Sequence, residues 1–123
     1  MFRRALLLAV LAAAVLAGCG GGEESLVAED DSTAAPDYRF VIPPGAGEAL
    51  DRGEPLEILP GEMQVTVGEI IEIVNEDDRG HLAGPFFVGA GETLRQRFAS
   101  PGEFVGECTV HPSGQLVLEV LEP

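Results

Sequence analysis

Residues 101–112 read PGEFVGECTVHP, an expected strand that ends in a thiol and turns into an imidazole. The opening Pro-Gly pair predicts a turn, after which Phe104 and Cys108 share one face of the strand. Two residues then reverse the chain, and Pro112 keeps His111 out of the α region. We therefore expect a core-facing thiol and an imidazole, three residues later, that points back towards it.

Alternation with period two extends through the chain beyond residue 36. Polar and apolar side chains alternate in short segments separated by Gly and Pro, a pattern typical of a β-sandwich of antiparallel strands. Residues 48–51, inside the Gly- and Pro-rich stretch 43–55, have room for one helical turn at most. The sequence therefore predicts an all-β domain. Its alternating segments are 37–42, 63–67, 70–74, 94–98, 103–108 and 116–120.

Residues 1–18 have the pattern of a bacterial lipoprotein signal peptide. Arg3 and Arg4 precede 13 apolar residues, 5–17, whereas a membrane-spanning helix needs about 20. The run ends in Leu-Ala-Gly-Cys at 16–19, which resembles a lipobox and implies cleavage before Cys19 and lipid on that residue. We expect a cell-envelope protein, anchored to a membrane through Cys19 and facing the periplasm or the extracellular side.

The remaining chain divides into a linker and one domain. Residues 19–35 hold the lipidated Cys19 and a small, acidic stretch that predicts a flexible tether, and residues 36–123 are long enough for one compact domain. Loss of residues 1–18 changes the net charge from −14 to −16. This charge argues against nucleic acid and anionic membrane surfaces as partners. It fits a solvated surface that keeps an exported protein soluble, or a basic protein as partner.

Both histidines of the chain and one cysteine fall into a metal-ligand pattern. They are His81, Cys108 and His111, and two imidazoles with one thiolate are the equatorial ligands of a mononuclear blue-copper centre. If lipid occupies Cys19, Cys108 has no intramolecular partner for a disulfide, and an exported free thiol is open to oxidation unless a metal binds it. The sequence therefore predicts one copper ion bound by these three residues.

Several segments together resemble a small cupredoxin of the plastocyanin and amicyanin type. The resemblance covers roughly residues 56–122 and implies a Greek-key β-sandwich that holds one type 1 copper ion. It also implies the three equatorial ligands named above, a non-enzymatic role as an electron carrier cycling between Cu(I) and Cu(II), and a redox protein as partner. The segments that carry it are 65–69, 74–77, His81, 101–104 and 108–112.

The sequence departs from that family in two places. No Met follows His111 in the position of the usual axial ligand, which leaves Gln115, a water, a backbone carbonyl or no axial ligand as alternatives. Residue 82 is Leu, where the family often has a small polar side chain that ties the ligand loops together. The axial ligand and the hydrogen bonds around the ligands are therefore left open.

Three other functions remain as alternatives. A copper scavenger, chaperone or sensor would use the same ligands without electron transfer. A zinc hydrolase with one Cys and two His ligands needs a general base, but Glu107 has the opposite strand parity to Cys108, and Asp77 and Asp78 lie in a turn. A metal-free interaction domain is the third. For an electron carrier, residues 82–87 with Pro112 would give an apolar rim around His111 where a partner docks.

Overall fold

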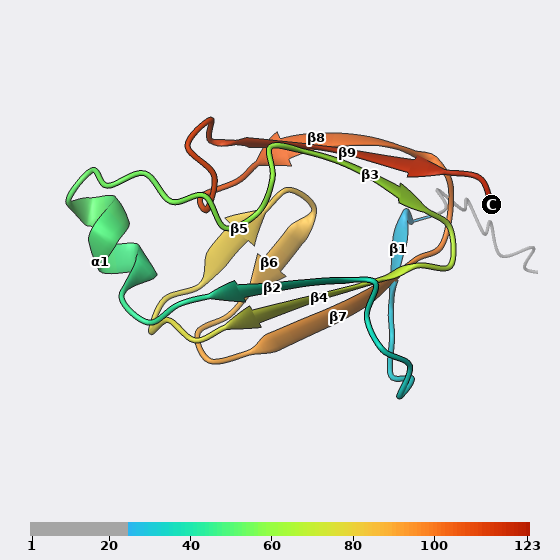
Figure 1. Cartoon of the computed structure of the whole chain (residues 1–123), viewed down its shortest axis with the longest axis horizontal. Coiled ribbons are helices and arrows are strands. Elements are labelled where there is room, and N and C mark those ends of the chain that lie inside the picture. The colour runs from blue at the N-terminus through green and yellow to red at the C-terminus, as the bar shows by residue number, and fades with distance from the viewer. Residues whose placement is uncertain (1–24) are drawn as a thin grey trace, which may run out of the picture.

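The computed structural model describes residues 25–123, which form a two-layered β-sandwich with a short helix at one end (Figure 1). The predicted all-β class is confirmed. One sheet has the order β1 (Val27–Glu29), β7 (Thr93–Phe98), β4 (Ile70–Asn75), β2 (Tyr38–Ile42). The other has the order β3 (Glu62–Thr66), β9 (Gln115–Leu121), β8 (Gly102–Glu107). A hairpin of β5 (His81–Ala83) and β6 (Phe86–Val88) and the helix α1 (Ala46–Asp51) complete the domain.

Two strand pairs run parallel, and for these the expectation of antiparallel strands was wrong. They are β2 with β4 and β3 with β9, while the other pairs are antiparallel. The chain passes from β2 through α1 to β3 in the other sheet before it returns to β4. β2 and β4 can run in the same direction because the connection between them passes through the other sheet.

Alternate residues of both sheets form one continuous core. Ile71, Ile73, Leu116 and Leu118 are fully buried between the layers, as their period-two spacing predicts. Phe98 packs edge-on against Phe86, with the ring centroids 6.5 Å apart. This core holds the ends of β4, β5 and β8 in fixed positions, and the candidate ligands lie at or just beyond such strand ends.

The segment 25–35 differs from the flexible tether expected there. Residues 27–29 form β1 and pair with β7, and Asp30 is buried. Arg95 Nε and Arg97 Nη2 each donate to the Asp30 carboxylate at 3.0 Å. These ion pairs compensate the burial of an acid that the local composition marks as solvated.

The predicted signal peptide, Cys19 and the first part of the linker lie outside the described residues. The lipid anchor therefore stays a prediction. Between residues 25 and 123, no helix is long and apolar enough to cross a membrane.

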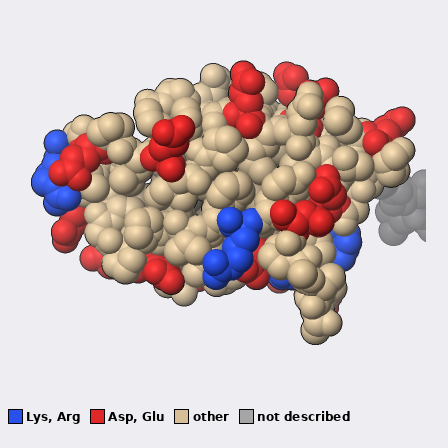
Figure 2. All heavy atoms as spheres, in the orientation of Figure 1, with Lys and Arg blue, Asp and Glu red and all other residues tan. Residues whose placement is uncertain are grey.

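Acidic side chains are distributed over the face seen in Figure 2, with few basic ones among them. Each of the five arginines between residues 25 and 123 forms an ion pair with a carboxylate; they are at positions 39, 52, 79, 95 and 97. The surface charge is therefore set by the excess of acids, and the arginines do not form a basic patch on this face.

Candidate metal centre

β5 brings His81 next to the strand that carries Cys108. Ala83 forms an isolated antiparallel bridge with Cys108, and the Gly84 N–H donates to the Glu107 carbonyl at 2.8 Å. In β5 the buried residues are His81 and Ala83, and Leu82 between them is exposed. Because residues two apart in a strand share a face, the His81 imidazole and the Cys108 thiol lie on the same, buried side.

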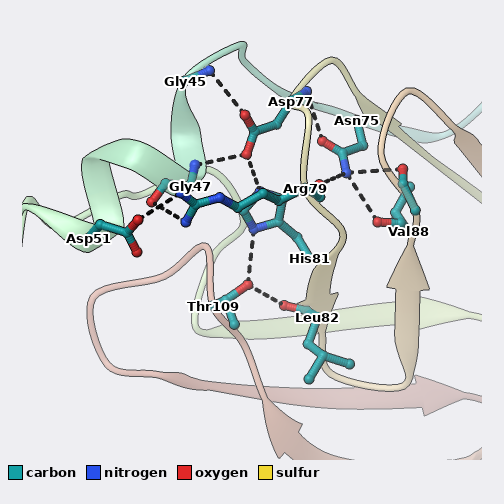
Figure 3. A network of polar contacts seen from close by, with 11 residues as sticks. Gly45, Gly47, Asp51, Asn75, Asp77, Arg79, His81, Leu82, Val88 and Thr109 are labelled. Carbon is teal, nitrogen blue, oxygen red and sulfur yellow. Dashed lines mark hydrogen bonds and ion pairs between the residues drawn. The ribbon is translucent and has the colours of Figure 1, made fainter.

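Each ring nitrogen of His81 faces a polar side chain, but only Nε2 has a short hydrogen bond (Figure 3). Its Nε2 lies 2.7 Å from Oδ2 of Asp77, and both side chains are almost completely buried. A carboxylate can only accept, so Nε2 carries the proton. This hydrogen bond is the main cause that holds the pKa of the Asp77 carboxyl well below its usual range; burial opposes it, and the backbone N–H of Gly47 adds to it.

The other ring nitrogen of His81 faces the loop that follows Cys108. Nδ1 lies 3.4 Å from Oγ1 of Thr109, longer than the usual 2.7–3.2 Å of a hydrogen bond. The Thr109 hydroxyl donates to the Leu82 carbonyl at 3.2 Å, and the Thr109 N–H donates to the same oxygen at 2.9 Å. With the hydroxyl proton directed to Leu82, the Nδ1 lone pair is left without a strong donor and is available to bind a metal.

These contacts also answer the question raised by Leu82. Its side chain does not tie the ligand loops together, but its carbonyl does, through Thr109. The polar group of this link therefore lies in the Cys-x-x-His segment and not after the first histidine.

Cys108 is completely buried and is not in a disulfide. Burial raises the pKa of its thiol, and the Val110 N–H, which points at the sulfur, partly offsets this. The Cys108 N–H donates to the Gly114 carbonyl at 2.9 Å and fixes the loop between them. The thiol is thus in an apolar, enclosed position where a metal would have to stabilise the thiolate.

The His111 side chain is hydrogen-bonded within its own loop, to Ser113. Its Nδ1 accepts the Ser113 N–H at 3.1 Å and lies 2.7 Å from the Ser113 hydroxyl. The ring packs against Gly61 so closely that a Cβ there would be 3.0 Å from Cε1 of His111. The partly exposed ring borders an open hollow of about 450 Å³ that Glu62 and Gln115 also line.

The structure therefore brings two of the three predicted ligands onto one buried face and leaves the third on the loop. Between residues 25 and 123, no group of three or more His, Cys, Asp or Glu side chains is arranged to hold a metal ion. His111 would have to exchange its bonds with Ser113 for the metal. The role of all three as ligands remains a prediction.

Gln115 and Glu107 lie at the rim of this region. Gln115 is exposed at the start of β9, and its carbonyl accepts the Ser113 hydroxyl at 3.1 Å. Its role as an axial ligand stays a prediction. Glu107 is exposed and, as its strand parity predicts, lies on the opposite face of the chain from the buried Cys108.

Sequence reasoning missed Asp77 as the partner of His81. The sequence marks it only as an acid in a turn between 76 and 80. Asn75 shapes that turn, because its Nδ2 donates to the Arg79 carbonyl at 2.7 Å and its Oδ1 accepts the Asp77 N–H at 3.0 Å. An Asn at the end of a buried strand, four residues before a carbonyl it can reach, was the available signal.

The donor chemistry of the region fits copper in part. A buried imidazole with a free Nδ1 and a buried unpaired thiol are donors that copper accepts, and a second imidazole lies three residues from the thiol. Together with the fold, they define an all-β sandwich with a candidate His-Cys metal site at the end that carries α1.

Comparisons with known proteins give similar structures but no sequence family. No family profile matches the chain, and no curated protein matches it. Amicyanin from Paracoccus versutus is similar over 80% of this chain and 100% of its own, with 15% identity and a TM-score of 0.48. A purple cupredoxin from Nitrosopumilus maritimus is similar over 69% of this chain and 100% of its own, with 19% identity and a TM-score of 0.43.

Another similar structure is that of a larger protein. A copper-containing nitrite reductase from Thermus scotoductus SA-01 is 26% identical over 72% of this chain, with a TM-score of 0.43. The match covers only 23% of that enzyme.

Proposed function

We propose that the protein is a copper-binding electron carrier, lipid-anchored through Cys19 and without an enzymatic activity of its own. The observation that carries the proposal is the pairing of two buried donors on one face, the free Nδ1 of His81 and the unpaired thiol of Cys108. When bound, copper would supply a one-electron couple between Cu(I) and Cu(II). His81, Cys108 and His111 would hold it.

The chain's own residues would keep the two buried donors in place in both oxidation states. Backbone bonds between β5 and the loop after β8 fix Leu82 against Thr109, so His81 and Cys108 cannot separate without breaking them. A fixed donor geometry favours electron transfer, because little rearrangement accompanies the change of oxidation state. This supports a carrier over a scavenger, chaperone or sensor.

The electron would leave through the partly exposed His111, on the side of the hollow that it lines. An apolar pair close to the site offers a docking surface for a redox protein. Leu82 and Phe87 lie opposite each other in the β5–β6 hairpin and are 37% and 62% exposed. Phe86, in contrast, is buried in the core.

The position of β1 is compatible with this role. β1, the first described strand, and the C-terminus lie at the end of the sandwich opposite α1 and the candidate site (Figure 1). A tether that leaves before β1 would hold the site away from the membrane, where a partner protein can reach it. The large acidic excess on the domain favours a partner with a basic surface.

The test is the absorption and EPR spectrum of the metal-free protein after addition of Cu(II), compared with Cys108→Ser. We expect an intense thiolate-to-copper absorption band that the variant lacks. Copper bound without that band would contradict the blue-copper assignment and favour a simple binding role. Zinc retained against excess copper, with hydrolytic turnover, would favour the hydrolase alternative.

A further inference from the structure

We propose that residues 26–34 are a strap that docks onto the domain and shortens its tether to the membrane, an inference that rests on the proposed lipid anchor at Cys19. The strap runs along the edge of β7. The Leu26 carbonyl accepts the Ala99 N–H at 2.8 Å, and β1 pairs antiparallel with β7. A segment with the composition of a linker is therefore part of the sheet.

A buried carboxylate holds the middle of the strap. Asp30 is 8% exposed, and its two carboxylate oxygens accept from Arg95 Nε and Arg97 Nη2, each at 3.0 Å. Both arginines belong to β7 and stay with the domain. The Ser32 hydroxyl donates to the same carboxylate at 2.9 Å, and the Ala34 carbonyl accepts from Arg95. The two arginines therefore bind the strap through its buried charge.

The apolar contacts of the strap are few. Leu26 and Val27 are half-buried, and the two residues that follow are exposed. Leu26 lies against Gly102, where a Cβ would be 2.7 Å from its Cδ2, and Val27 packs against the core. Because two half-buried side chains remove little apolar surface from water, the ion pairs of Asp30 decide whether the strap stays docked.

The strap sets how far the domain can move from a lipid on Cys19. With the strap docked, Leu26 is the first fixed residue, seven residues after Cys19, and a fully extended chain of this length spans about 25 Å. With the strap released, the next fixed residue is Asp37, whose N–H donates to the Ile70 carbonyl at 2.9 Å. It lies eighteen residues after Cys19, a span of about 60 Å when fully extended. Docking therefore more than halves the longest reach.

The docked strap also orients the domain. β1 lies at the end of the sandwich opposite α1 and the candidate site (Figure 1). A short tether that ends at β1 keeps this end towards the membrane and turns His111 towards the aqueous side. A docked strap therefore favours a partner on the aqueous side, whereas a released strap lets the domain turn His111 towards the membrane.

The competing explanation is that residues 26–34 are an ordinary part of the fold whose loss unfolds the domain. Asp30→Lys separates the two, because it places a cation beside Arg95 and Arg97 and repels the strap. Asp31→Lys is the matched control, because Asp31 is exposed and its substitution changes the net charge equally. The lipidated proteins are compared on phosphatidylcholine bilayers, by hydrogen exchange and by neutron reflectometry.

We expect the wild type and Asp31→Lys to behave alike. The Ala99 N–H should be protected from exchange by its bond to Leu26, and the gap between bilayer and domain should be no larger than about 25 Å. In Asp30→Lys, this N–H should exchange about tenfold faster or more, and the gap should widen. The amides of β4, in the middle of the sheet, should keep their protection.

An Ala99 N–H that exchanges in the wild type as fast as in an unfolded peptide overturns the proposal, and this measurement needs no variant. Lost protection throughout β4 in Asp30→Lys overturns it too, because the segment then unfolds together with the domain. Equal gaps in the two variants have the same consequence. A wild type that washes off the bilayer disproves the lipid anchor and, with it, the strap as part of a tether. A wild type that stays anchored but binds no copper disproves the electron carrier and leaves the strap intact.

Discussion

The two histidines of the candidate site are held in opposite ways. His81 is 3% exposed, lies at the start of a strand and is bonded to a buried carboxylate. His111 lies on a partly exposed loop, and within residues 25–123 its side chain is hydrogen-bonded only to Ser113, two residues away. The first candidate ligand is thus built into the sandwich of the metal-free protein, whereas the second belongs to a surface loop.

This difference indicates how the site would divide its tasks. The His81 half, with Asp77 and Cys108, would fix the geometry, since all three side chains are buried. The His111 half would complete the set of ligands and provide the partly exposed ring through which the electron would leave. Each prediction below sets one half against the other.

The largest difference is expected from alanine substitution of each histidine in the metal-free protein. His81→Ala leaves a cavity and takes from the buried Asp77 its ring donor, so the free energy of unfolding should fall by about 3 kcal/mol. His111→Ala should change it by less than about 0.5 kcal/mol, as at an ordinary surface position. Urea unfolding curves measure both.

Equal losses in the two variants would show that the halves are not held differently. A loss confined to His111→Ala would mean that the loop, and not the strand, is the rigid half.

The pH dependence of stability tests the same buried pair. The pKa of Asp77 is lowered by its bond to His81, so the folded state binds this proton at lower pH than the unfolded state. The stability gained is complete above the ordinary aspartate pKa of about 4 and is lost as the pH falls below it. Urea unfolding of the metal-free protein between about pH 5 and pH 2 should therefore show a steeper decline in the wild type than in Asp77→Asn.

Parallel declines in the two proteins would contradict this prediction. They would assign the acid sensitivity to other carboxylates, and Asp77 would no longer distinguish the two halves.

The sequence was informative wherever a local pattern decides the structure. Alternation in the segments around 70–74 and 116–120 predicted strands that the structure contains. The strand parity of Cys108 predicted its burial, because Phe104, Gly106 and the sulfur share one face of the same strand.

Contacts between distant segments could not be predicted in this way. β1 was read as a tether because the burial of Asp30 depends on Arg95 and Arg97, more than 60 residues away. The sequence marks Asp77 only as an acid in a turn, because its burial depends on the glycine N–H groups at the start of α1, 30 residues earlier. Composition does not reveal such pairs, since each partner alone looks like an ordinary polar residue.

Thr109 joins the two halves, and its substitution should have an intermediate effect. Thr109→Val removes the hydroxyl bond to the Leu82 carbonyl but keeps the N–H bond to the same oxygen, so we expect a loss of about 1 kcal/mol in the free energy of unfolding. NMR signals of the His81 ring should shift, and those of His111 should not. A shift at His111 alone would contradict the placement of Thr109 beside Nδ1 of His81.

The smallest effect is expected from Ser113→Ala, which tests the His111 half alone. The Ser113 hydroxyl lies 2.7 Å from Nδ1 of His111 and 3.1 Å from the Gln115 carbonyl, and its one proton can bond to only one of them. If the hydroxyl bonds to Nδ1, it would compete with a metal for that side chain. If it does, removing it should strengthen copper binding about two- to tenfold, the equivalent of one hydrogen bond. Competition titration against a chelator measures the affinity, and Ser25→Ala, at an exposed position ahead of β1, is the matched control.

A weaker affinity in Ser113→Ala would mean the opposite: the hydroxyl would orient His111 for the metal, and the loop would be preorganised like the strand. An affinity equal to that of the control would mean that the hydroxyl bond does not compete with the metal. The sign of this small change therefore decides whether the two histidines differ in preorganisation or only in burial.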